Sequence, residues 1–385
     1  MATYKEQNKL NVPHLRFPKF YGEWCVSTIG EQFDLYSGNT PSRLNKEHFD
    51  GNVNWITSGE LKEHYISDTK EKISEYAATA NNLKLLHPGT FVIAIYGLEA
   101  DGVRGTGSIT CKESTISQAC MAFTQKGDVK NEFLYSWYKK HGNIIGIKYA
   151  QGTKQQNLSY DILEKFHIAY PSQDEQDKLI QFISLLDERI ATQSKLIEKL
   201  ESLIKGIAQH CIRELINGWE YVRLGDICKI TTGKLDANAQ VENGQYLFFT
   251  CAERPFNIDS YAFDTEALLI SGNGANLGYI NYYKGKFNAY QRTYVLDHFS
   301  VNIQYVKWAL KVLLPQRIAI EKSSSNTPYI VLSTLADLKI PIPNNSKQNH
   351  IADLMMSFER KLSTQLALSD LYNKQKQYLL RQMFI

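Results

Sequence analysis

The sequence predicts an α+β protein in which two pseudo-symmetric domains are separated by two long antiparallel coiled-coil helices. Three observations lead to this expectation. The chain has 385 residues, which exceeds the size of one ordinary domain core. Its two halves begin and end with similar segments. Each half closes on a long stretch in which apolar residues recur at heptad spacing.

The two halves begin alike. Residues 22–42 read GEWCVSTIGEQFDLYSGNTPS, and residues 218–238 read GWEYVRLGDICKITTGKLDAN. Three matches share one offset of 195 (219 minus 24): Trp24 with Trp219, Gly30 with Gly225, and Gly38 with Gly233. Matches locked in one register over so short a stretch indicate a duplicated module.

The two halves also end alike, at a second offset of 172 (343 minus 171). The matched pairs are Ile168 with Ile340, Pro171 with Pro343, Gln176 with Gln348, and Gln193 with Gln365. Between the two registers the second half is 23 residues shorter (195 minus 172). We therefore expect a module whose two ends are fixed while its middle varies in length and content.

Each half is predicted to be a β-rich domain with internal helices. Runs of β-branched and aromatic residues, punctuated by Gly, Asn and Asp, predict strands at residues 91–97, 267–274, 278–290 and 292–299. Helices are predicted at residues 131–142 and 302–314. The expected domains are residues 1–172, which include an N-terminal arm, and residues 218–343.

A long helix is predicted after each domain, at residues 173–217 and 344–385. The first apolar seam comprises Leu179, Ile183, Leu186, Ile190, Gln193, Ile197, Leu200, Ile204, Ile207 and Cys211. The second comprises Ile351, Met355, Phe358, Leu362, Gln365, Tyr372, Leu379 and Met383, and is weaker at Ser369 and Lys376. Each helix is about 60 Å long at about 1.5 Å per residue. Gly218 is expected to stop the first helix.

The two seams share a glutamine near the middle of each helix. If the helices pair antiparallel about a pseudo-twofold axis, the amides of Gln193 and Gln365 meet and hydrogen-bond to each other. Ile190 and Leu362 are then expected to pair the helices beside them. The alternative is that each glutamine is solvated at the edge of its seam.

Composition excludes several classes of protein. The apolar and charged fractions, 43% and 22%, are those of a folded globular protein. The opening segment has no apolar core of the kind found in signal peptides, and no window approaches 18 uninterrupted apolar residues. The six cysteines are scattered, without the close pairs of a metal knuckle or disulfide scaffold. We expect a cytoplasmic protein that neither spans a membrane nor binds a metal.

Enzymatic motifs are weak in this sequence. It contains no P-loop pattern, and its histidines lack the spacing of a helical metal site. The best catalytic alternative is a stand-alone methyltransferase built from Gly272-Asn273-Gly274 and Asn326-Thr327-Pro328-Tyr329. A nucleotide-binding glycine turn needs a helix after it, whereas NLGYINYYKGKF reads as a pair of strands. No catalytic residue is predicted.

The whole chain resembles the specificity (S) subunit of type I restriction-modification systems. The resemblance rests on residues 11–24 (NVPHLRFPKFYGEW), on residues 27–42, on residues 152–190, and on the closing KQYLLRQMFI, in a duplicated order. The second half departs from the first in two places. It has Ser323-Ser324-Ser325-Asn326 in place of Gly152-Thr153-Lys154-Gln155, and Lys347 in place of Glu175.

The resemblance implies two target-recognition domains separated by two long antiparallel coiled-coil helices, each domain reading one half of a split double-stranded DNA sequence. The helices then act as spacer and ruler. It further implies two methyltransferase (M) subunits and two restriction (R) subunits as partners. S-adenosylmethionine, ATP and Mg would be bound by those partners, so that this chain needs no cofactor of its own. A coiled-coil scaffold without DNA binding is a further alternative, which the net charge of +3 would fit.

Residues that could read bases are expected in loops, where Arg and Lys suit guanine edges and Asn and Gln suit adenine. In the first domain we predict Ser37, Asn39, Thr40, Ser42, Arg43, Tyr96 and Arg104. In the second we predict Thr232, Lys234, Arg254, Asn273, Asn276, Tyr290, Gln291 and Arg292. Each could instead be an ordinary turn residue. Gly38 and Pro41 are expected to shape a turn. Arg292, in FNAYQRTY, is the strongest single candidate.

The outer apolar residues of the first long helix are Phe182, Leu185, Leu196 and Leu203. They lie outside the expected seam. They are expected either to dock the methyltransferase subunits or to contact the chain's own domains.

Overall fold

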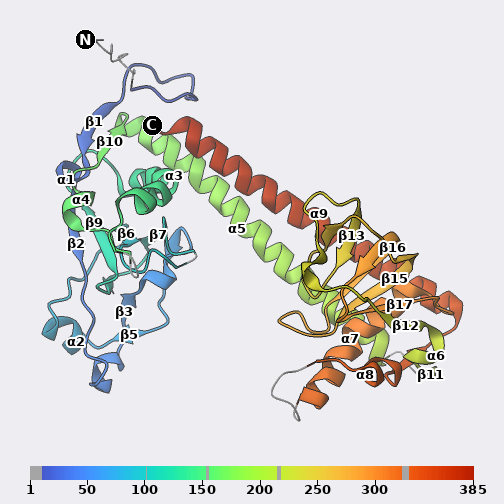
Figure 1. Cartoon of the computed structure of the whole chain (residues 1–385). Helices are drawn as coiled ribbons and strands as arrows, with labels where there is room; N and C mark the ends of the chain where they lie inside the picture. Colours follow the sequence, from blue (N-terminus) through green and yellow to red (C-terminus); the bar gives the residue numbers. More distant parts are fainter. Residues whose placement is uncertain (1–10, 101, 153–155, 215–217, 323–328) are drawn as a thin grey trace. The chain divides into compact units, whose positions relative to one another are not determined.

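The computed structural model describes residues 11–100, 102–152, 156–214, 218–322 and 329–385. The chain forms two compact units (Figure 1). The first unit consists of Met1–Ser194 with Leu368–Ile385, and the second of Lys195–Ala367. Each unit contains one β-rich domain and a segment of both long helices.

Both domains are closed by the same pair of strands. In the first domain, β1 (Cys25–Thr28) pairs antiparallel with β10 (His167–Tyr170). In the second, β11 (Glu220–Arg223) pairs antiparallel with β18 (Lys339–Ile342). The strand registers are identical once the offsets of the repeat are applied, because each opening strand is displaced by 195 residues and each closing strand by 172. The matching ends of the sequence therefore form one closed frame in each half.

The variable middle of each half forms the sheets. The first domain has a five-stranded sheet of order β2-β9-β6-β7-β4 and a three-stranded sheet of order β5-β3-β8, whereas the second has one six-stranded sheet of order β12-β17-β15-β16-β13-β14. The first domain's strands are β2 (Phe33–Ser37), β3 (Val53–Ile56), β4 (Tyr65–Ile66), β5 (Lys72–Ile73), β6 (Phe91–Ala94), β7 (Gly107–Thr110), β8 (Ser114–Ile116) and β9 (Cys120–Gln125). The second domain's strands are β12 (Lys229–Thr232), β13 (Tyr246–Phe249), β14 (Phe256–Ile258), β15 (Phe263–Ser271), β16 (Ile280–Ala289) and β17 (Thr293–Asp297).

One helix of the domain itself packs on the sheet of each domain. These helices are α3 (Asn131–Tyr149) and α7 (Ile303–Lys322), and both extend beyond the predicted ranges. Short helices complete the frame: α1 (Ile29–Gln32) and α4 (Tyr160–Leu163) in the first half, α6 (Leu224–Ile227) and α8 (Leu332–Ala336) in the second. The first domain adds α2 (Glu75–Ala80) beside the three-stranded sheet. The α+β class, the four predicted strands and the two predicted helices are confirmed.

The two long helices are α5 (Gln173–Gln209, 37 residues) and α9 (Asn345–Met383, 39 residues). A π-helical turn, His210–Glu214, follows α5, and the expected end at Asn217 lies outside the described residues. Every predicted seam residue of α5, and Cys211 in the turn after it, is buried or half-buried. In the second unit Leu200 and Ile204 of α5 share one core with Ile351 and Met355 of α9.

Within the first unit, α5 and α9 run antiparallel. The Nζ of Lys376 forms an ion pair with the Asp187 carboxylate, and the guanidinium of Arg189 donates to the Tyr372 hydroxyl at 2.8 Å. Residue numbers rise along one helix as they fall along the other. Lys376, a weak position of the predicted seam, is therefore a half-buried partner of Asp187.

The paired glutamines of the prediction belong to different units, Gln193 to the first and Gln365 to the second. Gln193 is buried, and Gln365 and Ile190 are half-buried. A hydrogen bond between the two amides stays a prediction.

A buried glutamine fastens the start of each long helix to its domain. In the first unit, Gln176 Oε1 accepts from the backbone N–H of Lys130, which precedes α3, at 2.9 Å. Gln176 Nε2 donates to the carbonyls of Asp128 and Pro171, each at 3.1 Å. One side chain thus satisfies three backbone groups that would otherwise be unpaired in the interior.

The second unit repeats this arrangement at the offset of 172. Gln348 Oε1 accepts from the Asn302 N–H, which precedes α7, at 3.0 Å, and Gln348 Nε2 donates to the Pro343 carbonyl at 2.8 Å. Gln176 and Gln348 are 0% and 2% exposed. We call this pair the glutamine anchors.

The halves also differ at the position before each glutamine anchor, and this difference has a physical cause. Glu175 is buried and accepts two hydrogen bonds, of 2.7 and 2.6 Å, from the guanidinium of Arg16 in the N-terminal arm. The matching Lys347 is exposed. A buried carboxylate is stable at this position because the arm supplies its cation.

A half-buried ionic cluster links the first domain to both long helices. His64 Nε2 lies 2.8 Å from a Glu132 oxygen of α3, and His64 Nδ1 lies 3.1 Å from an Asp187 oxygen of α5. The imidazole ring stacks between Tyr65 and Tyr135, at 4.1 and 3.9 Å between ring centroids. Burial opposes the charged ring, but its contacts with Asp187 and Glu132 outweigh burial and raise the pKa of His64.

The second unit also places a carboxylate at the equivalent position of its long helix. Glu359, which follows Asp187 at the offset of 172, forms ion pairs with Lys307 and Lys311 of α7, at 2.6 and 2.9 Å. In both units a carboxylate on the long helix therefore meets a cation supplied by the domain.

The residues at the chain's carboxyl end belong to the first core. Leu379, Leu380, Met383 and Phe384 are buried there, and the Phe384 ring lies 5.2 Å from that of Phe133.

The glutamine anchors lead to a stability prediction. Gln176→Leu and Gln348→Leu should each lower the free energy of unfolding by about 2–4 kcal/mol, because a buried group left without a partner costs about 1–3 kcal/mol. Thermal and denaturant unfolding of each variant measure this. Gln181→Leu, at an exposed position of α5, is the matched control. Unchanged unfolding of both anchor variants would contradict the assigned role.

The ionic cluster leads to a prediction of pH dependence. The pKa of His64 is raised above its ordinary 6.5. The stability that its charge contributes is therefore complete below about pH 6.5, and it is lost as the pH rises through the pKa of His64 in the folded protein. Burial opposes the charged form of Asp187, but contacts with His64 and Lys376 lower its pKa below 3.8, so that this carboxylate stays charged throughout. His64→Gln should therefore destabilise the protein more at about pH 6 than at about pH 8.5.

Melting temperatures at the two pH values measure this difference. His87→Gln, whose native side chain is 85% exposed, is the control and should show equal effects at both. Equal destabilisation by His64→Gln at both pH values would count against the cluster.

Candidate nucleic-acid interface

Backbone hydrogen bonds gather the predicted residues of the second domain at one edge of its sheet. The Gly272 N–H donates to the Arg292 carbonyl at 2.8 Å, the Gln291 N–H to the Leu235 carbonyl at 2.9 Å, and the Cys251 thiol lies 3.5 Å from the Arg292 carbonyl. These bonds join the loops that follow β12, β13 and β15 to the turn between β16 and β17. Thr232 is the last residue of β12, and those loops hold the other seven predicted residues: Lys234, Arg254, Asn273, Asn276, Tyr290, Gln291 and Arg292.

Five of these side chains face solvent, namely Thr232, Lys234, Arg254, Gln291 and Arg292. Three of the five are cationic, as a surface that approaches phosphates requires. Asn276 is half-buried, and its Nδ2 donates to the Cys251 carbonyl at 3.1 Å. This asparagine holds two loops together.

A glycine permits the loops to approach so closely. A Cβ on Gly233 would lie 1.9 Å from the Ala289 carbonyl oxygen, and a Cβ on Gly38 would lie 1.9 Å from that of Ile116. No larger residue fits without displacing backbone. The shared glycine thus shapes the same junction in both domains, as expected for Gly38, and Pro41 is buried.

The first domain forms the corresponding edge. The Asn39 N–H donates to the Ile116 carbonyl at 3.2 Å, and the Ile95 N–H donates to the Ala119 carbonyl at 2.9 Å. These bonds bring the loop after β2 and the loop after β6 to the turn before β9. The predicted residues Asn39, Thr40 and Tyr96 lie on these loops, and Ser37 is the last residue of β2. Ser37 and Asn39 are exposed, Tyr96 is 38% exposed, and Thr40 is half-buried.

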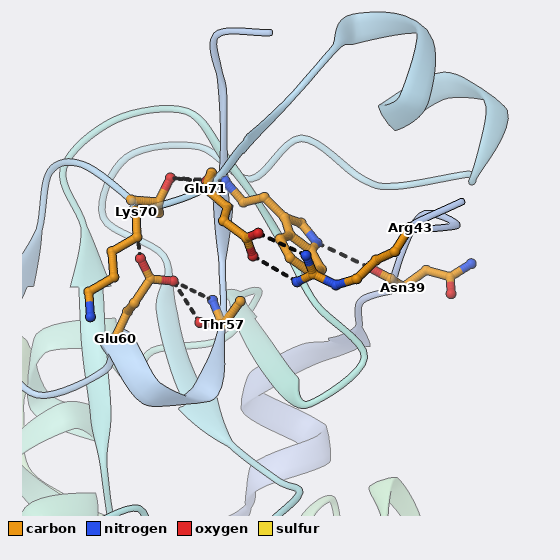
Figure 2. A network of polar contacts seen from close by, with 8 residues as sticks. Asn39, Arg43, Thr57, Glu60, Lys70 and Glu71 are labelled. Atoms are coloured by element: carbon orange, nitrogen blue, oxygen red, sulfur yellow. Dashed lines mark hydrogen bonds and ion pairs between the residues drawn. The ribbon is translucent and has the colours of Figure 1, made fainter. Parts of the chain in front are cut away.

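Arg43 is held by a carboxylate on the neighbouring loop. Its Nη1 and Nη2 donate to the two oxygens of Glu71 at 2.8 and 2.7 Å, and Figure 2 shows the two planar groups facing each other. Its guanidinium also lies 4.9 Å from the Phe49 ring centroid. The hydrogen bond from Arg43 lowers the pKa of Glu71. The Arg43 guanidinium could contact guanine only if its hydrogen bonds to Glu71 were broken.

The same close-up shows how the adjoining loop is fixed. The Trp55 indole N–H donates to the Asn39 carbonyl at 3.2 Å, so that the loop after β2 is tied to β3. Glu60 accepts from the Thr57 N–H at 2.9 Å and from the Lys70 N–H at 2.7 Å (Figure 2). Two segments of the loop region are thus joined by one carboxylate. Ser42 beside them is exposed.

Arg104 lies against α3 instead of facing solvent. Its aliphatic stem packs over Gly146, and its Nη2 donates to Gln156 Oε1 at 2.8 Å. The side chain is half-buried. Arg104 therefore braces its loop in this structure.

One exposed residue at the first domain's edge was missed by the sequence reasoning. Gln118 occupies the turn between β8 and β9, where the second domain has Gln291. The offset between them is 173 (291 minus 118), which differs from both offsets of the matching ends. The signal was the Gln within ISQACMAF and AYQRTYVL, which only an alignment of the variable middles reveals.

Within the described residues, no group of three or more His, Cys, Asp or Glu could hold a metal ion. The Gly272-Asn273-Gly274 turn leads into β16 and not into a helix, and the segment predicted as a pair of strands contains the one strand β16. Asn326-Thr327-Pro328 lies outside the described residues, as do Ser323–Asn326 and Thr153–Gln155. Of the helices described, none is long and apolar enough to cross a membrane.

Relatives of known designation resemble this chain. It is 43% identical, over 149 residues, to the type I restriction enzyme EcoDI specificity subunit of Escherichia coli, a match that covers 39% of this chain and 31% of that protein. It is 24% identical, over 364 residues, to the MjaIX specificity subunit of Methanocaldococcus jannaschii, covering 83% of each.

Solved structures share the fold. The S subunit of a type I restriction-modification system from M. genitalium superposes with a TM-score of 0.66 at 19% identity, covering 97% of this chain and 99% of that one. A chain from a study of complex assembly and conformational transition in the type I R-M system gives a TM-score of 0.58 at 17% identity, covering 93% and 96%.

The family model for the type I restriction modification DNA specificity domain matches twice, at residues 21–202 and 216–368. The two matches cover most of the chain and fall on its two halves. This chain therefore belongs to the type I restriction-modification DNA specificity family.

Proposed function

We propose that this chain is the non-catalytic DNA-reading subunit of a type I restriction-modification complex, in which each domain binds one half of a bipartite double-stranded target. The target-recognition domains are residues 1–172 and 218–343, and the helical spacers are residues 173–217 and 344–385. One observation carries the proposal: both domains build the same edge of exposed polar loops on the same closed frame.

The loop edge suits sequence reading because its side chains differ between the domains while the backbone hydrogen bonds of its central turn correspond. Lys234, Arg254 and Arg292 supply charge for phosphates and guanine, and Gln291 supplies an amide for adenine. The Asn39 amide is instead used within the chain, where its Oδ1 accepts from the Thr40 N–H at 2.8 Å. The first domain, whose Arg43 is paired with Glu71, presents mainly neutral polar groups. Two different half-sites are the expected consequence.

The long helices are proposed to fix the separation of the half-sites. Helices of 37 and 39 residues are about 55–60 Å long at about 1.5 Å per residue. A stiff connection gives the second domain a high effective concentration only where the spacing between half-sites fits. Each glutamine anchor, with the carboxylate contacts of Asp187 and Glu359, supports this stiffness at the domain end of its helix.

The partners are proposed to be two methyltransferase and two restriction subunits in the cytoplasm, and these would bind S-adenosylmethionine, ATP and Mg. The outer leucines of α5, Leu185, Leu196 and Leu203, are 58%, 47% and 52% exposed and are candidates for docking the methyltransferase subunits. Phe182 is different. It packs on Phe17 of the arm, at 5.7 Å between ring centroids, and so contacts the chain itself.

Co-expression with a methyltransferase subunit of the same type tests the proposal. Mapping of methylated bases over a genome should give one bipartite motif, since two separate domains read it. The methyltransferase subunit expressed without this chain is the control and should give no such motif. A continuous motif, or the same motif without the chain, would refute the proposed function.

Lengthening α5 tests the role of the helices. Four residues inserted after Ser194 add about 6 Å at about 1.5 Å per residue, which is close to two base pairs at about 3.4 Å each. The spacer of the methylated motif should change while both half-sites stay the same. The same insertion between Lys112 and Glu113, in an exposed turn, is the control. An unchanged spacer in the helix variant would exclude the ruler.

A further inference from the structure

A four-residue turn at residues 117–120 forms the centre of the first domain's loop edge. The Ser117 N–H donates to the Ile56 carbonyl at 2.9 Å, and the Cys120 N–H closes the turn on the Ser117 carbonyl at 3.0 Å. The Ala119 carbonyl accepts from the Ile95 N–H at 2.9 Å. Two neighbouring segments, at Ile56 and Ile95, and one bond within the turn therefore fix its backbone.

The turn at residues 290–293 is built in the same way in the second domain. The Tyr290 N–H donates to the Phe249 carbonyl at 2.9 Å, and the Thr293 N–H closes on the Tyr290 carbonyl at 2.8 Å. The Arg292 carbonyl accepts from the Gly272 N–H at 2.8 Å. Each contact of the first turn has its counterpart here, although the sequences between the frames differ in length.

The second residue of each turn is a glutamine. Gln118 and Gln291 are both exposed, and in the part of the chain that the structure describes neither side-chain amide has a hydrogen-bond partner. The backbone of each turn is fixed, so that only the side-chain rotamers are lost on binding. An unpaired amide on a rigid turn is suited to a polar ligand.

The third residue of the turn is not shared. Ala119 offers no hydrogen-bonding side chain, whereas Arg292 is an exposed guanidinium. Two turns that share the glutamine but differ at the next residue would read the same base with the glutamine and would differ in their preference at the adjacent base.

Resting on the proposed function, we propose that Gln118 and Gln291 each read an adenine, one in each half of the target. A glutamine amide matches adenine in the major groove because its oxygen accepts from N6–H while its nitrogen donates to N7. Because Ala119 stands where the second domain has Arg292, a guanine contact from this position is expected in the second half-site only. Each half-site then contains an A·T pair at the same place relative to its domain.

The experiment uses this chain in complex with its methyltransferase subunit and a DNA library that varies every position of both half-sites. Gln118→Ala should reduce the preference for adenine at one position of one half-site by about tenfold, and Gln291→Ala should do so in the other half-site only. Gln125→Ala, an exposed glutamine at the far end of β9, is the matched control.

The outcomes separate the glutamine assignment from the proposed function. A bipartite wild-type motif that both alanine variants recognise with unchanged base preference would overturn the assignment and leave the function intact. Loss of methylation at all sites, with unchanged melting of the variants, would also overturn it, since a base reader must act at one position. A wild-type complex without a bipartite motif would overturn both.

Discussion

The hydrogen bonds of two buried glutamines determine how each domain meets its helix. Gln176 and Gln348 each join three parts of a unit: the strand that closes the domain, the helix on its sheet, and the first turn of the long helix. Glutamine suits this place because its amide is both donor and acceptor, and it carries no charge that would have to be desolvated. A carboxylate could not donate to the proline carbonyl.

The rest of the structure follows from this junction. Since the frame is closed by the same strand register in both halves, the sheets between its ends can differ without moving the long helix. The first domain has two sheets and the second has one, yet both present their loops through the same glycine contact. A fixed frame with a variable insert allows the recognised sequence to change while the attachment to the helices is preserved.

The frame could be predicted from the sequence because its two offsets are visible in Trp, Gly, Pro and Gln matches. The seams of the long helices could be predicted because their apolar spacing is local. The pairing of Lys376 with Asp187 could not be predicted, since the partners are 189 residues apart (376 minus 187). In the sequence, Lys376 only interrupts the apolar seam. For the same reason the bonds of Arg43 to Glu71 and of Arg104 to Gln156 were not predicted, and Gln118 was overlooked because the middles align at neither offset.

The first unit is assembled from two separate stretches of chain, which has a consequence for biosynthesis. Leu379, Leu380, Met383 and Phe384 fill part of a core whose other walls are translated more than 190 residues earlier (379 minus 183). That core stays incomplete on the ribosome while the entire second domain is being made. The second unit, which is continuous in sequence, can therefore reach its native packing before the first one does.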